Sequence, residues 1–390
     1  MEKRNQQHTV IIPSYNTLEH LKNTYQSIKK YAPNVDILII DDASEDGTKK
    51  WLLSLEDKNL TTIISPTRRG HTYWYDEGIK QSTNEIISIL HSDMIIGPNY
   101  FDNMLKHLER GKVVCATRIE PPIHPKGKEK IIKDFGDEAH NFKWKEFEEF
   151  INNENKIQKD ITTQGIFAPW MLYKEDHLSI GGHDQRFSPY GYEDSDIFNR
   201  WILEGYEMVQ SRDSLCYHMT CRGHKWNKGV GIVNPDYEST MSRCRKEFLR
   251  KWGGWIQNNE YQYPIIHPKY DIGIKLKGGN SQLLEILEPW CSNICLDDEM
   301  QVITSHYIDK EQSNTIIDLS KKIISTPSQF LKNEIIIEID QTKFTQQDFQ
   351  IIQQLPEIIK DSGEIGKFQL GNIFIDIRQM NEYQNELIKI

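Results

Sequence analysis

The chain has 390 residues, of which 37% are hydrophobic and 27% charged, as expected for a soluble globular protein of more than one domain. A formal net charge of −10 excludes a nucleic-acid binder that tracks phosphates with a basic face. The sequence has neither an apolar stretch of roughly 20 residues that could span a membrane nor the apolar region of a signal peptide near its start. We therefore expect a cytoplasmic protein.

The first hundred residues alternate short apolar strands with helical patterns. Strands of a parallel sheet that is covered on both faces are continuous apolar runs joined by helices. The pattern therefore predicts an α/β fold with a mainly parallel, Rossmann-like sheet and helices on both faces. The predicted strands are Thr9–Pro13, Val35–Ile40, Thr61–Ser65 and Glu85–Leu90, and the predicted helices are Leu18–Tyr31, Gly47–Leu55 and His71–Ser82.

Polar side chains follow three of these strands. They belong to Ser14–Asn16, Asp41–Asp42 and His91–Asp93. Ligands of open α/β sheets bind beyond the carboxyl ends of the strands, so we expect these three groups to converge on one site.

The middle of the chain interrupts this alternation. The segment Lys130–Lys159 is charged and aromatic, and the sequence leaves open whether it is a lid, an acceptor-side element or a helix over the core. The aromatic, proline-containing stretch Asn258–Lys269 predicts a linker. We therefore expect two domains, residues 1–260 and 270–390.

The last third of the chain predicts a small acidic α/β domain without a catalytic motif. Acceptor binding, oligomerisation and docking of a partner all stay open for it. The predicted strands are Asp271–Lys277, Gln301–Ile308 and Glu334–Ile339, followed by a helix over Phe344–Ile359 and a hairpin over Phe368–Ile375.

Six cysteines are too scattered for a disulfide scaffold, but a zinc site is conceivable in one short segment. Cys216, His218, Cys221 and His224 follow one another closely. Structural zinc sites usually have two ligand pairs separated by a loop. The spacing therefore favours one inward thiol on a strand and another in the loop after it.

Four motifs resemble, in their order and spacing, the inverting glycosyltransferases of family 2, which have the GT-A fold. The resemblance extends from Thr9 to Trp226, and the C-terminal third lies outside it. The motifs are VIIPSYN (Val10–Asn16), DDASEDGT (Asp41–Thr48), HSD (His91–Asp93) and the long run that begins with GGHDQRF and ends with EGY (Gly181–Tyr206).

The resemblance implies that a sugar moves from a nucleotide-diphosphate donor to an acceptor hydroxyl with inversion. A UDP-sugar is the favoured donor, and the acceptor is an unidentified glycan, lipid or protein. Family members hold the nucleoside at positions that correspond to Pro13, Tyr15 and Asp42. Tyr15 could supply a flat slot for the base, whereas Asp42 could instead cap the turn that follows it.

The resemblance also implies a divalent cation on the diphosphate. Asp93 corresponds to a metal ligand, and His218 to a metal-binding histidine. Where the family often has Asp-x-Asp, this chain has His91-x-Asp93, and His91 could bond a ribose hydroxyl. Oxygen ligands suit Mg²⁺ and a mixed oxygen and imidazole set suits Mn²⁺, so the expected cofactor is Mn²⁺ or Mg²⁺.

The catalytic base is expected at the start of a helix near Glu193. Helical spacing places Asp194 on the same face as the apolar Ile197 and Phe198, and directs Glu193 and Asp196 elsewhere. A carboxylate that is aimed inward is costly unless it has a function. The family uses the residue at Asp194 as general base, and a helix-capping role is the alternative.

Further positions are expected to contact substrate or to be structural. Asp184 corresponds to a family position near the sugar or acceptor, and Glu193 is a further candidate for substrate binding. Arg69 is a candidate for the diphosphate, as are Arg222, His224 and Lys225. Asp196 and Arg200 have the spacing of an ordinary helical ion pair.

Two other functions compete with sugar transfer. A sugar-nucleotide pyrophosphorylase needs a Gly-rich, basic loop after the first strand, whereas this chain has Pro13–Asn16 there. A non-catalytic nucleotide-sugar-binding or assembly module would leave the base position vacant, whereas Asp194 is present.

Overall fold

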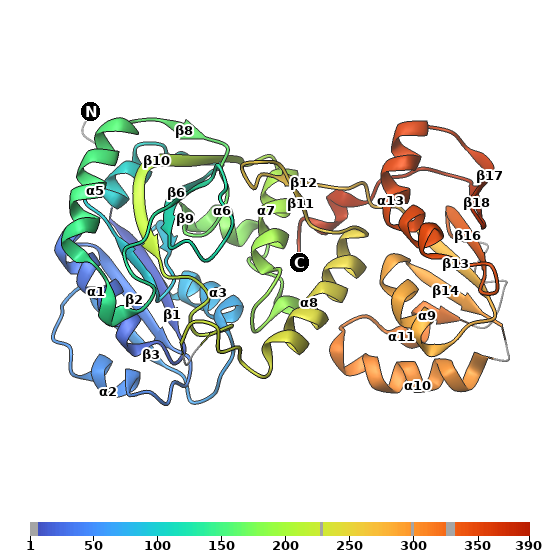
Figure 1. Ribbon diagram of the computed structural model, residues 1–390, viewed down its shortest axis with the longest axis horizontal. Helices are drawn as coiled ribbons and strands as arrows, with labels where there is room; N and C mark the ends of the chain where they lie inside the picture. Colours follow the sequence, from blue (N-terminus) through green and yellow to red (C-terminus); the bar gives the residue numbers. More distant parts are fainter. Residues whose placement is uncertain (1–6, 227–228, 298–299, 325–331) are drawn as a thin grey trace. The chain divides into compact units, whose positions relative to one another are not determined.

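The computed structural model describes residues 7–226, 229–297, 300–324 and 332–390, which form two compact units (Figure 1). Unit 1 contains the chain up to Thr240 together with 258–264 and 389–390, and unit 2 contains 241–257 and 265–388. The predicted ranges of 1–260 and 270–390 thus differ from the structure, because residues 241–257 pack with unit 2. No helix among the described residues is long and apolar enough to cross a membrane.

Unit 1 is built on one ten-stranded, mostly parallel sheet. Its main strand order is β3-β2-β1-β4-β9-β6-β10-β5, with β7 beside β6 and β8 beside β10. The strands are β1 (His8–Ser14), β2 (Asp36–Asp41), β3 (Leu60–Ile64), β4 (Ile86–Ile89), β5 (Met94–Ile96), β6 (Lys112–Glu120), β7 (Lys130–Ile132), β8 (Thr162–Thr163), β9 (Trp170–Tyr173) and β10 (Glu207–His218).

Helices cover both faces of this sheet, as predicted. Alternate residues of β1 point to opposite faces, and Val10 and Ile12 pack with Leu21 of α1 on one of them. On the other face, a Cβ added at Gly78 of α3 would lie 2.6 Å from the side chain of Ile11. The helices are α1 (Leu18–Tyr31), α2 (Thr48–Leu53), α3 (His71–Gln81), α4 (Tyr100–Leu105), α5 (Trp144–Ile157), α6 (Lys174–Ser179) and α7 (Glu193–Leu203).

The segment Lys130–Lys159 forms β7 and the helix α5, which packs over the core. Phe147 and Ile151 of α5 are fully buried in one cluster with Leu215 and Tyr217 of β10. Of the alternatives that the sequence left open, the structure therefore shows a covering helix.

Unit 2 is a six-stranded sheet with the order β15-β14-β13-β16-β18-β17. Side chains of α9, α10, α11 and α13 share one isoleucine-rich core with one face of this sheet. The strands are β13 (Ile272–Lys277), β14 (Asn293–Leu296), β15 (Ile323–Ile324), β16 (Ile335–Asp340), β17 (Gly366–Leu370) and β18 (Ile373–Ile377), and the helices are α9 (Ser281–Leu287), α10 (Gln301–Glu311), α11 (Leu319–Lys322) and α13 (Gln346–Ser362).

One predicted strand of unit 2 is wrong. Gln301–Ile308 lies in the helix α10. Its β-branched residues favoured a strand, but Ile303, Tyr307 and Ile308 lie on one helical face against the core, while Val302 is 82% exposed. The predicted linker Asn258–Lys269 contains the short strands β11 (Gln257–Asn258) and β12 (Pro264–Ile265), which pair with each other.

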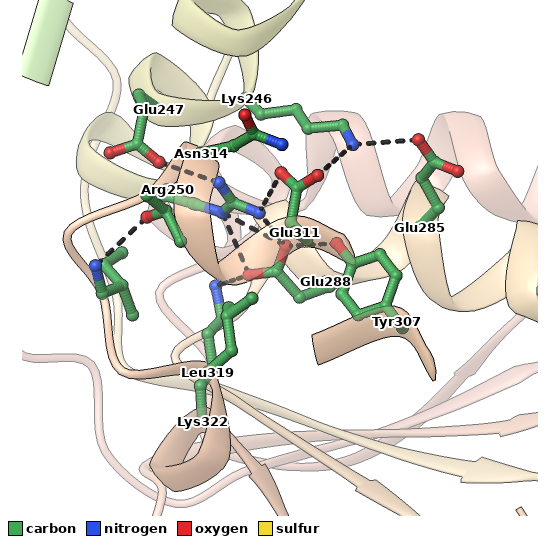
Figure 2. A network of polar contacts seen from close by, with 12 residues as sticks. Lys246, Glu247, Arg250, Glu285, Glu288, Tyr307, Glu311, Asn314, Leu319 and Lys322 are labelled. Atoms are coloured by element: carbon green, nitrogen blue, oxygen red, sulfur yellow. Dashed lines mark hydrogen bonds and ion pairs between the residues drawn. The ribbon is translucent and has the colours of Figure 1, made fainter. Parts of the chain in front are cut away.

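A buried network of charges anchors, within unit 2, the part of the helix α8 (Tyr237–Trp252) that follows Thr240 (Figure 2). The Arg250 guanidinium donates to Glu288 at 2.6 Å, to Glu247 at 2.8 Å and to Glu311 at 2.9 Å. Burial would raise the pKa of Glu288, but Lys322 and Arg250 lower it to about 2. The network explains why residues 241–257 belong to unit 2.

Replacing the central cation should destabilise unit 2. Arg250→Met leaves three carboxylates around an apolar side chain, and breaking a buried ion pair in this way costs about 3–5 kcal/mol. The matched control is Lys310→Met, because Lys310 is 64% exposed and lies 3.9 Å from Glu285. The stability of unit 2 in both variants is measured by urea denaturation and then by hydrogen exchange of the 265–388 amides. Equal stability of the two variants would contradict the structural role of the network.

Candidate functional site

A cleft that is partly open to solvent lies at the carboxyl ends of the central strands of unit 1. It brings together the three polar groups that the sequence placed after β1, β2 and β4, as expected for an open α/β sheet. The lining residues are Pro13, Ser14, Tyr15, Asp42, Arg68, Gly70, His71, Tyr75, His91, Ser92, Asp93, Tyr190, His218, Arg222, Gly223 and His224.

The loops after β1 and β2 hold each other in place beside Tyr15. The backbone N–H of Asn16 donates to Ser44 Oγ at 2.9 Å, and the backbone N–H of Glu45 donates to the side-chain oxygen of Asn16 at 2.8 Å. The Arg68 guanidinium lies 4.1 Å from the centre of the Tyr15 ring. Tyr15 therefore forms a flat wall with a cation against it.

Asp42 organises the beginning of α3. Its carboxylate accepts the backbone N–H groups of Arg69 at 2.7 Å and Gly70 at 2.8 Å, and the indole N–H of Trp74 at 2.6 Å. The alternatives predicted for Asp42 from the sequence were ligand binding and capping of the local turn. The structure shows a third role, because Asp42 holds a distant segment in place. Oδ2 accepts only one of these bonds, so it retains capacity for another.

Of two consecutive arginines, the structure places the unexpected one in the cleft. Arg69 was one of four candidates for the diphosphate, but its guanidinium lies 4.1 Å from the ring centre of Tyr73, and Arg68 lines the cleft instead. The two arginines are chemically equivalent in sequence. Only the direction in which the chain enters α3 separates them.

The segment before α7 docks on the start of α3. Ser188 Oγ donates to the Arg69 carbonyl at 2.9 Å, and a Cβ at Gly70 would overlap Pro189. His71 Nε2 lies 2.7 Å from a carboxylate oxygen of Glu193. Burial lowers the pKa of His71, but the Glu193 carboxylate outweighs that effect and raises it.

The predicted orientations at the start of α7 are partly wrong. Glu193 and Asp196 were expected to point away from the core, but both are buried. The Asp196–Arg200 pair forms at 2.8 Å as predicted, yet both side chains are fully buried rather than solvated. Arg200 also donates to the carbonyls of Ile180 and Gly182, which ties α7 to the preceding loop. A helical wheel misses these tertiary partners.

Among the described residues, Asp194 is not one that lines the cleft, but its charge acts on Tyr75 and His71, which do line it. Desolvation first, and the neighbouring Glu193 carboxylate second, raise the pKa of Asp194 to about 7. After burial, Asp194 is the main cause of the raised pKa of Tyr75, which lines the cleft. A carboxylate with a pKa near neutrality can accept a proton from a substrate at physiological pH.

Three buried side chains fix the loop that precedes α7. Asp76 Oδ1 lies 2.9 Å from His177 Nε2 and 2.8 Å from His183 Nδ1, and Asp76 also accepts the backbone N–H of His183 and the amide of Gln185. These donors saturate the carboxylate, which argues for a hydrogen-bonded clamp rather than for a metal site. The next residue, Asp184, binds Arg186 at 2.8 Å.

A second group has the character of a metal site. His91, Asp93 and His218 each offer a ligand atom, and these atoms lie within 4.8 Å of one another. The strand register brings them together, since Met94 of β5 pairs with His218 of β10. Burial and the neighbouring His218 hold the pKa of His91 well below its ordinary value, so that its imidazole is neutral, as a metal ligand must be.

Glu120 supports this group from the end of β6. Its Oε1 lies 3.3 Å from His218 Nδ1, and Arg118 and Lys130 bind the same carboxylate at 2.6 and 2.9 Å. A carboxylate behind a histidine fixes the orientation of the ring in many metal sites. Nothing in the sequence around Glu120 indicates this role, because it depends on the pairing of β6 with β10.

The crowded cysteine and histidine segment does not form a zinc site among the described residues. Cys216 is buried in the hydrophobic core, and the thiol of Cys221 lies 3.7 Å from His124. His218 turns to Asp93 instead, at 3.5 Å. In the same segment, Nε and Nη1 of the buried Arg222 have no hydrogen-bond partner within the part of the chain that the structure describes.

Two segments of the chain match families of sugar transferases. Residues 9–178 match the family described as glycosyl transferase family 2. Residues 152–224 match the family described as N-terminal domain of galactosyltransferase.

Individual relatives match about half of the chain. An uncharacterized glycosyltransferase of Bacillus subtilis, YfnE, is 24% identical over 253 residues, which are 54% of this chain and 64% of the relative. Validoxylamine A glucosyltransferase of Streptomyces hygroscopicus subsp. jinggangensis is 23% identical over 240 residues, 53% of this chain and 54% of the relative. A mannosyltransferase from Pyrobaculum calidifontis, solved with GDP-Man and Mn²⁺, aligns with a TM-score of 0.40 at 17% identity, covering 56% of this chain and 59% of that one.

The close approach of Gly70 to Pro189 should make this glycine sensitive to substitution. Both Gly70 and Gly111 have a positive φ, of +90° and +76°, but a Cβ at Gly111 meets nothing within 4 Å. Gly111→Ala should therefore cost only the backbone strain of about 1–2 kcal/mol, whereas Gly70→Ala should also displace the loop and separate Glu193 from His71. NMR titration should then show a lowered pKa for His71 in Gly70→Ala alone. An unchanged His71 pKa in Gly70→Ala would disprove the docking.

Proposed function

We propose, because residues 9–178 match glycosyl transferase family 2, that the chain transfers a sugar from a nucleotide-diphosphate donor to an acceptor hydroxyl with inversion. The observation that carries the proposal is the convergence of the His91, Asp93 and His218 group with Tyr15 and Asp42 in one cleft. Such a cleft has a flat wall for a base and charged groups for phosphates, both of which a nucleotide sugar needs.

Asp194 is proposed as the general base. Its carboxylate takes the proton of the acceptor hydroxyl while the hydroxyl oxygen forms a bond to the anomeric carbon. The bond from that carbon to the diphosphate oxygen breaks at the same time, and the nucleoside diphosphate leaves. The raised pKa of Asp194 supports this role, because a base that titrates near 7 binds and releases a proton readily.

The leaving diphosphate needs positive charge. Two guanidinium nitrogens of Arg222 are buried at the cleft without a partner among the described residues, while the third is bound to the Asp137 carbonyl. Buried donors are rarely left unsatisfied, so a phosphate oxygen is a fitting acceptor for them. Arg68 adds a second cation across Tyr15.

A divalent cation would be held by His91, Asp93 and His218, with Glu120 orienting the His218 ring. Mn²⁺ fits two imidazoles and one carboxylate better than Mg²⁺ does. When bound, it would supply Lewis-acid stabilisation of the diphosphate charge.

The favoured donor is a UDP-sugar. Tyr15 and Pro13 offer a flat, apolar surface to the base. Asp42 Oδ2 has capacity for one further hydrogen bond, which suits the one ring N–H of uracil. The substrate-binding roles of Asp184 and Glu193 stay predictions, since among the described residues neither lines the cleft.

Removal of the base should abolish turnover but not donor binding. Asp194→Asn should lower kcat by about 10²–10⁴ and leave the Kd for nucleotide within a few-fold, as measured by transfer assays and calorimetry. In the wild type, kcat should fall as the pH drops below about 7, because the Asp194 carboxylate is then protonated. Normal turnover by Asp194→Asn would show that another group is the base.

Removal of one metal ligand should abolish cation binding. Mn²⁺ should raise the Tm of the wild type but not that of His218→Ala, whereas the exposed His140 gives a control in His140→Ala. Glu120→Gln should weaken Mn²⁺ binding by about 10–100-fold, as loss of a supporting carboxylate does elsewhere. A full Mn²⁺ response in His218→Ala would rule out this ligand set.

A further inference from the structure

Besides the cleft of unit 1, a cavity lies in unit 2, on the face of its sheet opposite to the core. About 1100 Å³ of space, partly open to solvent, lies over β13, β16, β18 and β17. The helices α9, α10, α11 and α13 share their core with the other face. Isoleucines of β18 point to that core, and the alternate residues Phe374 and Asp376 point to the cavity.

A continuous row of side chains crosses this outer face. Gln369 of β17 pairs with Phe374 of β18, Phe374 pairs with Glu338 of β16, and Glu338 pairs with Lys275 of β13. Directly opposed residues have Cβ atoms about 4.5–5.5 Å apart. An exposed phenyl ring therefore lies between an amide and a carboxylate, with an ammonium group beyond them. We name this row the outer-face groove.

Phe374 is the apolar part of the groove. Its side chain is 54% exposed although its strand is buried on the other face. An exposed aromatic ring that lines a cavity gains free energy only when a ligand covers it. The flat ring matches the apolar C–H face of a pyranose sugar.

The charges of the groove disfavour other ligands. Lys275 pairs with Glu338 at 3.4 Å, and Arg378 pairs with Asp376 at 3.0 Å. A phosphate or nucleotide would meet the carboxylates of Glu338 and Asp376 among the lining cations, which are Lys275, Arg378 and Lys367. A protein partner would have to bury them near the centre of an interface, where charged residues are depleted.

Sugar hydroxyls, by contrast, both donate and accept hydrogen bonds. The Gln369 amide can do the same, Glu338 can accept and Lys275 can donate. These groups flank Phe374 on the same face of the sheet. An aromatic platform with a few polar groups around it is the common design of a small-ligand site.

We infer that the outer-face groove binds a neutral oligosaccharide, which is the acceptor class of the transfer proposed above. The acceptor assignment rests on the proposed function. The binding of glycan to the groove stands on the geometry of unit 2.

The test is a screen of the purified full chain against an array of neutral and acidic oligosaccharides, followed by calorimetry with the strongest neutral binder. Phe374→Ala should weaken that binding by about tenfold or more, the effect of losing one aromatic anchor. Val302→Ala, which truncates an even more exposed apolar residue on α10, should change nothing. Nucleotide release from UDP-sugars without acceptor should be equal in all three proteins.

Each other outcome is decisive. No neutral glycan bound, or a bound glycan whose affinity is unchanged in Phe374→Ala, overturns the inference while normal nucleotide release leaves the proposed function intact. Glycan binding that Phe374→Ala abolishes, in a chain that releases no nucleotide with any donor, retains the groove and overturns the transferase. A dimer in light scattering that Phe374→Ala dissociates would make the groove an interface between two copies and overturn the inference.

Discussion

The hydrogen bonds of the Asp42 carboxylate set the geometry of the whole site. They hold the backbone of Arg69 and Gly70 and the indole of Trp74, and so determine where α3 begins. A carboxylate that accepts three N–H groups in a buried place is rigid, because leaving any of these donors unpaired would be costly. The end of β2 is thereby connected to a segment 27 residues further along the chain.

The segment that carries the proposed base then packs against the beginning of α3. The loop before α7 contacts Arg69, Gly70 and His71, while Asp76 clamps His183 one turn later. The nucleoside side of the cleft and the base thus share one helix. A shift of α3 would therefore displace both the nucleoside side of the cleft and the base, since packed helices move as rigid bodies.

Buried charged side chains have different roles in the two units. In unit 1, Glu120 is surrounded by Arg118, Lys130 and His218, and this cluster serves a candidate cation site. In unit 2, the carboxylates around Arg250 anchor helices (Figure 2). Buried ion pairs contribute little net stability, but they impose one arrangement on their partners. The outer-face groove adds a polar surface whose charges are paired and exposed.

The sequence by itself determined the parallel α/β sheet, the polar residues at its edge and the resemblance to a family of sugar transferases, because strand and helix periods and ordered motifs are local properties of the chain. It also placed Pro13, Tyr15, Asp42, His91, Asp93 and His218 in one cleft, since strand ends converge in such a sheet. Only the tertiary structure decided that Arg68 rather than Arg69 lines the cleft, that Glu193 turns to His71 and that Glu120 supports His218. These outcomes depend on contacts between segments tens of residues apart. The same holds for Gln301–Ile308, which is a helix and not the predicted strand, because packing against one core outweighed β propensity.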